Sequence, residues 1–346
     1  MSKPQVYILN EKKEWDTGLV QALHDHGFVC HMWSLHNIFI SLSKHTPPPA
    51  PSSIFINRFS PSFYWRDKGR INTLGSVRGL VRWLESQGHR VINGTQAVEL
   101  EASKVAQYLA CRQAGLRAPY TTMVVGAVDT WRDALQEWKK RPLHSSSAPI
   151  VIKPNCGGSG QNVRIFENLP ALEQELRESP EWFSQVSVDG VALMQDMIQA
   201  SFIYRLEFIG GDLFYVVKIR AGSSSLNRCP CEQNLSTEED GAAATCARAP
   251  KFEIVHTFPQ NESEWMLVQT LRRMLRLNNV CIAGIEIMQD AQQRWWIIDC
   301  NCVNTNYNVV AEKNADLAVG GNARIAQWLG GALLTAEAEQ AEEEDP

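Results

Sequence analysis

Three oxygen-bearing side chains lie in two neighbouring segments that otherwise have the composition of buried strands. Glu286 lies in Ala-Gly-Ile-Glu-Ile-Met (283–288), and Asp299 and Asn301 lie in Trp-Ile-Ile-Asp-Cys-Asn (296–301). The polar stretch between the two apolar runs predicts a hairpin. Asp299 and Asn301 are two residues apart, so they share one face of a strand. Two carboxylates and an amide are hard oxygen donors that suit Mg²⁺, an ion that often also binds nucleotide phosphates.

A second segment has the composition of a phosphate-binding loop. Lys153 ends an apolar strand, and Gly157, Gly158, Ser159 and Gly160 follow. Glycines let backbone N–H groups approach a phosphate, and the lysine adds a positive charge. The lysine precedes the glycines, so the segment is not a Walker loop, and it also lacks the G-x-G-x-x-G pattern. Taken alone, a glycine-rich hairpin turn explains it equally well.

Two further segments could contact a nucleotide or another anion. The apolar strand that ends in the linker 195–198 could present backbone groups to an adenine edge. When this segment is considered by itself, a core strand that ends in a turn is the better explanation. Arg205 alternates with apolar residues, and Lys218 and Arg220 share a face of the returning strand. Cations that face inward are costly unless they meet an anion. We therefore favour an anion site over a solvent-facing strand edge.

The elements that must position these residues begin with an alternation of strands and helices. A helix is expected after the first strand, with Asp16 as its N-cap, and another over Ser76–Gln87. The expected strands of this part are Gln5–Leu9, Phe28–Leu35, Ser53–Arg58 and Val91–Ile92. The pattern predicts a small parallel sheet flanked by helices.

The rest of the chain contains the chemistry-bearing segments. Expected helices cover residues 102–114, 130–140, 170–185, 263–277 and 322–334. Expected strands cover residues 121–125, 149–153, 162–166, 191–195, 202–208 and 213–220, the last two joined by a Gly-Gly turn. Residues 222–251 form a long polar loop, and the acidic end, residues 336–346, is expected to be disordered.

Composition is that of an ordinary globular chain. The chain has 346 residues, of which 44% are hydrophobic and 21% are charged, and its formal net charge is −5. The charge argues against nucleic acid as a partner, and no apolar run approaches the length of a membrane span. The start lacks a signal-peptide core, so we expect a cytoplasmic protein with small-molecule substrates, whether monomer or homodimer.

Nine cysteines, spread thinly over the chain, are expected to be free thiols. Cys229-Pro-Cys231 and Cys300-Asn-Cys302 lack the usual spacing of structural zinc sites. Cys300 and Cys302 also alternate with Asp299, so they should face away from it. A zinc or redox protein is therefore the weakest interpretation.

The order of these segments, starting from Lys104 and ending at Asp299-x-Asn301, resembles the ATP-grasp superfamily. Within it, the chain is similar to carboxylate–amine ligases of the RimK-like glutamate-ligase and D-alanine–D-alanine-ligase type. The resemblance covers roughly residues 95–335, and Asp299 follows Glu286 by 13 positions (299 − 286). It implies an α/β ATP-grasp fold. The implied parts are an N-terminal domain (1–98), an ATP-grasp domain (99–335) with a lid at about 118–195, and the tail 336–346.

The resemblance also implies roles for individual residues. Lys104 matches the first ATP-contacting lysine, and Lys153 matches the second, in the lid. Arg205 and Arg220 match cations near the transferred phosphoryl group. The ATP-binding set is completed by the lid loop and the adenine linker: Gly157, Gly158, Ser159, Gly160, Gln195, Asp196 and Ile198. Glu286, Asp299 and Asn301 match the ligands of Mg²⁺, for which Mn²⁺ is an alternative.

Three departures from the family pattern concern the metal ligands, the position two residues before Arg205 and the acceptor end. The usual Asp and Glu of the metal site are exchanged, and Ile203 stands where an acid is common. The loop after Asn301 is Asn-rich instead of Pro-Gly, so Asn304 and Asn306 are candidate substrate contacts. Arg58 follows a predicted strand and could hold a substrate carboxylate, although a turn with a surface arginine explains it equally well.

The implied activity is ATP-dependent ligation of a carboxylate to an amine through an acyl-phosphate, with release of ADP and phosphate. The substrates would be an amino acid or small peptide. A kinase on the same fold and a non-catalytic nucleotide-binding scaffold remain as alternatives. A kinase for a polyphosphorylated acceptor would need extra clustered basic residues, and the sequence does not show them.

Overall fold

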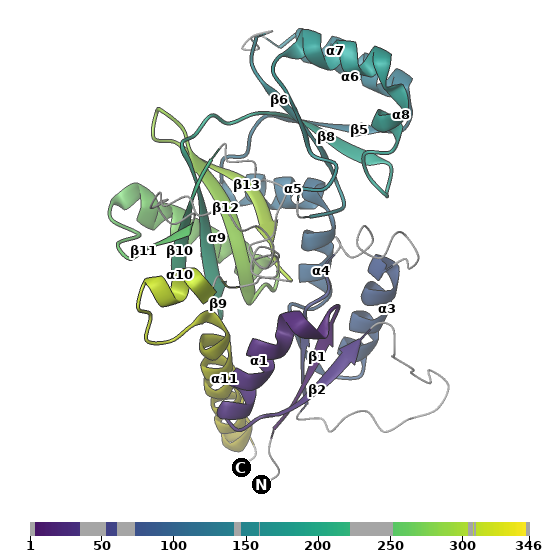
Figure 1. Cartoon of the computed structure of the whole chain (residues 1–346). Coiled ribbons are helices and arrows are strands. Elements are labelled where there is room, and N and C mark those ends of the chain that lie inside the picture. Colours follow the sequence, from purple (N-terminus) through teal and green to yellow (C-terminus); the bar gives the residue numbers. More distant parts are fainter. Residues whose placement is uncertain are drawn as a thin grey trace, which may run out of the picture.

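The computed structural model has an α/β architecture built on three sheets (Figure 1). The part of the chain that it describes comprises residues 4–34, 53–60, 73–141, 147–158, 160–221, 252–303, 307 and 309–343. Figure 1 shows the sheets one above another, with helices α1 (Lys13–Asp25) and α11 (Gly321–Glu343) side by side at the foot of the molecule.

The N-terminal sheet is parallel, with the order β2-β1-β3-β4. Its strands are β1 (Gln5–Asn10), β2 (Val29–Ser34), β3 (Ile54–Asn57) and β4 (Arg90–Ile92). Helix α1 (Lys13–Asp25) packs on one face, and α3 (Thr73–Ser86) and α4 (Thr95–Ala102) pack on the other. Because both faces are covered, the central strand β3 is buried along its whole length and β1 is largely buried, whereas the edge strands β2 and β4 are only partly buried.

The second sheet is antiparallel, with the order β5-β8-β6-β7, and lies at the top of Figure 1. Its strands are β5 (Thr121–Val125), β6 (Ile150–Pro154), β7 (Arg164–Phe166) and β8 (Val191–Asp196). One face packs on α6 (Val128–Lys139), α7 (Leu169–Glu178) and α8 (Pro180–Ser184). The other face carries Met123 and Lys153, which alternate with residues of that core.

The third sheet is antiparallel, with the order β11-β10-β9-β12-β13. Its strands are β9 (Phe202–Ile209), β10 (Asp212–Arg220), β11 (Phe252–Val255), β12 (Ile282–Gln289) and β13 (Trp295–Asn301). Helices α5 (Lys104–Ala114) and α9 (Glu262–Leu277) cover one apolar face. On the other face, polar side chains separate two apolar clusters, and those polar residues form the candidate site.

Two features join the N-terminal and third sheets. Helix α11 (Gly321–Glu343) packs between them, in one core with Ile209 and Ile282. Asn93, after β4, uses its side-chain amide on both sides: Oδ1 accepts from the Cys281 and Ile282 N–H groups, and Nδ2 donates to the carbonyls of Ile282 and Cys302. This amide fixes the β12–β13 hairpin against the first sheet.

The structure corrects several expectations. Asp16 is not an N-cap, because α1 begins at Lys13 and Asp16 lies inside it, buried. The helix expected over 170–185 is broken at Ser179, since Pro180 has no N–H to continue it. Strand β11 and helix α10 (Val309–Asn314) were not predicted. Residues 336–343 of the expected disordered tail continue helix α11, because alanine and glutamate are strong helix formers.

Candidate active site

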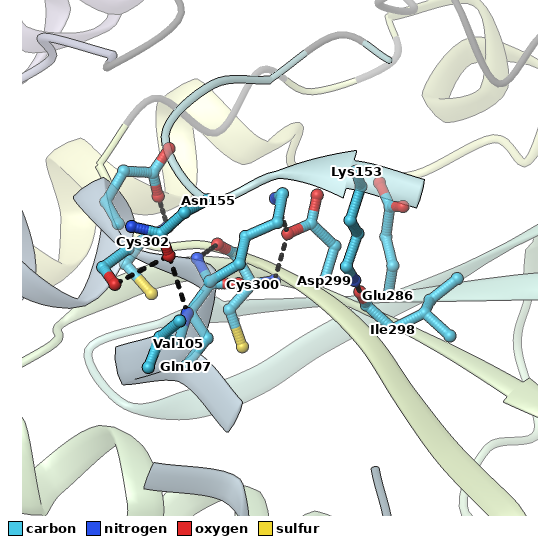
Figure 2. A network of polar contacts seen from close by, with 12 residues as sticks. Val105, Gln107, Lys153, Asn155, Glu286, Ile298, Asp299, Cys300 and Cys302 are labelled. Carbon is cyan, nitrogen blue, oxygen red and sulfur yellow. Dashed lines mark hydrogen bonds and ion pairs between the residues drawn. The ribbon is translucent and has the colours of Figure 1, made fainter. Parts of the chain in front are cut away.

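The β12–β13 hairpin gathers the three predicted metal ligands on one face. Glu286 lies directly opposite Asp299, and Asn301 lies opposite Gly284. Directly opposed residues of antiparallel strands point to the same side. Figure 2 shows Asp299 and Glu286 on one side of the hairpin and the sulfur of Cys300 on the other. Cys300 and Cys302 are buried in the core below, as the alternation predicted.

Lys104 reaches this face from the first turn of α5. Its Nζ lies 2.6 Å from Asp299 Oδ1, and the lysine is buried. The turn is held by Ser103, whose hydroxyl accepts from the Ala106 N–H. Asn155 holds the same turn, because its Oδ1 accepts from Val105 N–H and its carbonyl accepts from Lys104 N–H. The loop after Lys153 therefore positions Lys104.

Asn155 and Gln107 are site residues that the sequence did not reveal. Asn155 also donates from Nδ2 to Asp189, so it ties α5 to the second sheet. Gln107 binds Cys300 on both backbone groups: Nε2 donates to the carbonyl at 2.8 Å, and Oε1 accepts from the N–H at 3.3 Å. These contacts between Gln107 and Cys300 fix β13 beside α5 (Figure 2) and so keep Asp299 within reach of Lys104.

Lys153 crosses from the second sheet to the third. Its Nζ donates to the carbonyl oxygen of Ile298 at 3.1 Å, one residue before Asp299 (Figure 2). Burial and the nearby charge of Lys104 lower the pKa of Lys153 to about 8. The charges of Lys104 and Lys153 repel each other, and a nearby anion would stabilise both. The geometry therefore favours an anion between the second and third sheets.

Arg205 is the third cation of the site. Its Nε donates to Glu207 at 2.6 Å, and its Nη1 donates to Glu286 at 3.0 Å. A Cβ placed on Gly284 would lie 2.2 Å from Arg205 Nη2. Gly284 therefore opens the space above β12 in which the guanidinium lies.

The donor set fits a hard divalent cation. Burial opposes ionisation of Asp299, but the charges of Lys104 and Lys153 outweigh it and hold its pKa below the usual value. Burial raises the pKa of Glu286, and Arg205 opposes that rise. Both carboxylates remain 27% exposed, so a cation could reach them. They now bind Lys104 and Arg205, which shows that this face attracts positive charge.

Arg220 does not join Arg205, contrary to the prediction. A regular hairpin around Gly210-Gly211 would place both arginines on one face, but a bulge between Leu213 and Tyr215 shifts the register. Arg205 consequently lies opposite Val217, and Arg220 lies opposite Phe202 on the other face. Lys218 shares that other face, with its Nζ 4.0 Å from the centre of the Phe202 ring.

The linker 195–198 is less available to an adenine than predicted. The Asp196 N–H donates to the Tyr120 carbonyl, and the Met197 N–H donates to the Pro149 carbonyl. The Asp196 carboxylate accepts two hydrogen bonds from Arg141, and the Gln195 amide donates to Thr121. An adenine at this linker would therefore have to use carbonyl groups or residues from Ile198 onward.

Arg58 lies at the end of β3 as predicted, but it is buried. Its Nε donates to Asp16 at 2.9 Å, with both side chains at most 5% exposed. A substrate carboxylate would thus meet a guanidinium that already has an anionic partner. Among the lid glycines, Gly157 and Gly160 have positive φ angles, which suits glycine. Gly158 is also described, whereas Ser159, Asn304, Asn306, Cys229 and Cys231 lie outside the described residues.

No family model and no curated protein sequence matches this chain. Several solved structures, in contrast, are similar to this chain. D-cycloserine synthetase DcsG superposes with a TM-score of 0.63 at 12% identity, over 95% of this chain and 99% of that one. The ATP-grasp ligase PsnB, complexed with a minimal precursor, gives 0.61 at 16% identity, over 97% and 99%. D-alanine–D-alanine ligase from Bacillus anthracis gives 0.60 at 11% identity, over 98% and 100%.

These superpositions cover nearly the whole chain, so the protein has the ATP-grasp fold. The predicted fold class is confirmed. Among the described helices, none has the length and apolar character needed to cross a membrane. Over the same residues, no three His, Cys, Asp or Glu side chains gather as a metal cluster, and the predicted magnesium set uses two carboxylates and one amide.

Proposed function

We propose that the protein is an ATP-dependent carboxylate–amine ligase. The observation that carries the proposal is the meeting of Lys104, Lys153 and Arg205 around the Glu286–Asp299 pair. Three cations and two carboxylates from separate elements form one polar face. ATP-grasp ligases with the same fold support it, including PsnB in a complex with Mg and ADP.

The roles follow from charge and position. Glu286, Asp299 and Asn301 would hold Mg²⁺, which neutralises phosphate charge when it is bound. Lys104 and Lys153 would bind phosphate oxygens between the second and third sheets. The site needs no nucleophilic side chain, because a substrate carboxylate attacks the γ-phosphate and ADP leaves, which gives the acyl-phosphate. An amine then displaces phosphate from the acyl-phosphate to form an amide.

Arg205 has the position to act on the transferred phosphoryl group. Its guanidinium lies beside Glu286 and over Gly284, at the border between the metal ligands and the deeper part of the face. A fixed cation there stabilises negative charge as it develops, at little reorganisation cost. Arg220 lies on the opposite face and is left out of this proposal.

The test supplies Mg-ATP with a panel of amino acids and small peptides and determines the product masses. A ligase gives a product equal to two substrates less one water, together with ADP and phosphate. A product that carries one added phosphate and no second substrate would identify a kinase instead. The variant Trp265→Ala is a control, since Trp265 is exposed on α9, on the far face of the sheet.

A further inference from the structure

A second polar cluster lies deeper on the same face, beyond Arg205. Glu207 lies directly opposite Tyr215 in the sheet, and the rings of Tyr215 and Tyr307 are 6.2 Å apart. Tyr215 donates its hydroxyl to Glu312 of α10 at 2.9 Å. The cluster therefore continues the row of charged groups from the metal ligands towards α10 and the start of α11.

Two atoms of this cluster are buried without a hydrogen-bond partner among the described residues. They are Glu207 Oε2 and the Tyr307 hydroxyl oxygen. Glu207 is only 1% exposed, and its other oxygen binds Arg205. Buried polar groups are nearly always paired, so each exception requires an explanation. Two such atoms in one cluster indicate that their hydrogen-bond partner is a polar group that does not belong to the chain itself.

The excess of carboxylates in the cluster favours a cation as that group. Glu207 and Glu286 share the single guanidinium of Arg205, and Glu312 adds a third carboxylate. Burial and the neighbouring Glu207 raise the pKa of Tyr307 well above its usual range, so its hydroxyl stays protonated. A neutral hydroxyl can accept a hydrogen bond from a cation. Arg58, the other nearby cation, already binds Asp16.

Glu312 is held in place by groups of the chain itself. Its Oε1 also accepts from the Gly321 N–H at 2.9 Å, and a Cβ on Gly320 would lie 2.7 Å from its Oε2. Gly321 similarly leaves room for the ring of Tyr307, which a Cβ would meet at 2.2 Å. The backbone at the start of α11 thus packs tightly around Glu312 and Tyr307 and holds both side chains in place.

We propose that Glu207 Oε2 and the Tyr307 hydroxyl bind an ammonium group of a substrate. This subsite lies beyond Arg205 on the same face of the third sheet. This inference rests on the proposed ligase function, since it assigns part of the same face to an amino-bearing substrate. The ammonium belongs either to the acid that is activated or to the amine substrate in its bound state, which must give up one proton before its nitrogen attacks. Both have the same chemistry: three N–H donors with a positive charge.

The test measures binding and needs no turnover. Free amino acids and simple amines are titrated by calorimetry into the full chain saturated with Mg-ADP. Each ligand that binds is compared with its analogue that lacks the amino group. In the wild-type protein we expect removal of the amino group to weaken binding by about tenfold or more, as for a lost charge-assisted hydrogen bond. In Glu207→Gln the same removal should have little effect.

Tyr307→Phe gives a second variant, with an expected weakening of a few-fold for amino-bearing ligands only. Its matched control is Tyr204→Phe, because Tyr204 lies on the other face of β9 with Trp295. Glu253→Gln controls for the change in charge, because Glu253 is exposed on strand β11.

Two results would overturn the subsite. One is that no amino-bearing compound binds, which would leave water as the occupant of the subsite. The other is an equal loss of affinity in wild type and Glu207→Gln when the amino group is removed. The analogue series also shows whether the acid or the amine carries the ammonium. If ammonium binding is found but the bound ligands give no ADP, the ligase proposal fails while the subsite stands.

Discussion

Replacing Gly284 with alanine tests whether the position of Arg205 organises the site. The new Cβ would lie 2.2 to 2.7 Å from three guanidinium atoms, so Arg205 must move. The contact is with the end of a flexible side chain, and we therefore expect the chain to fold. The displaced guanidinium loses its hydrogen bonds to Glu207 and Glu286.

The expected magnitude follows from those two bonds. A hydrogen bond to a charged group contributes about 1.5–3 kcal/mol, and breaking a buried ion pair costs about 3–5 kcal/mol. Glu207 is almost fully buried, so little solvent is available to replace Arg205. We expect Gly284→Ala to lower the free energy of unfolding by about 3 kcal/mol, and ADP formation to fall about a hundredfold.

The assay combines urea unfolding with ADP release. Gly79→Ala is the control, because Gly79 lies in helix α3 and a Cβ added there would have no neighbour within 4 Å. That variant should be more stable than wild type by about 0.5–1 kcal/mol. A double-mutant cycle with Arg205→Met isolates the contact, since Gly284→Ala should then cost little. Equal costs of Gly284→Ala with and without the guanidinium would refute the reasoning.

Three further predictions concern the neighbouring charges. Asp299→Asn should leave a folded protein with ADP formation reduced at least about a hundredfold, and wild-type turnover would remove the metal assignment. The kcat/KM for Mg-ATP should fall above about pH 8, where Lys153 loses its proton, and this fall should be absent in Lys153→Arg, whose guanidinium stays charged. Burial raises the pKa of Glu101 from 4.5 to about 7, so its stabilising contribution is complete below pH 4.5 and is lost as the pH rises through 7. Unfolding free energies at pH 5 and pH 8 should show a loss of up to about 3 kcal/mol in wild type and almost none in Glu101→Gln, and equal losses would contradict the assignment.

The sequence predicted the residues that depend on local periodicity. Strand alternation was enough to place Asp299 and Asn301 on one face and Cys300 on the other. Lys153 was predicted at the end of its strand and lies one residue before the end of β6, whereas Lys104 was assigned through the family resemblance and begins α5.

Residues that depend on distant backbone partners were missed. Gln107 binds Cys300, which is 193 positions away, and Asn93 binds Cys302, which is 209 positions away. Neither side chain belongs to a short motif, so spacing carries no signal of its role. The error at Arg220 has a different origin, because a one-residue bulge in β10 reverses the face of every later side chain. A hairpin register of this kind is set by packing and not by the turn sequence alone.

Transfer of oxygen from a substrate carboxylate to phosphate tests the central claim most directly. The protein would be incubated with Mg-ATP and amino acids labelled with oxygen-18 in their carboxyl groups, together with small amines and peptides as acceptors. Formation of an acyl-phosphate followed by amide formation leaves one labelled oxygen in the released phosphate. We predict that the released phosphate carries one oxygen-18 atom and that its amount equals the amount of ADP formed. Unlabelled phosphate at the same level of ADP, or phosphate retained on the substrate, would contradict the account.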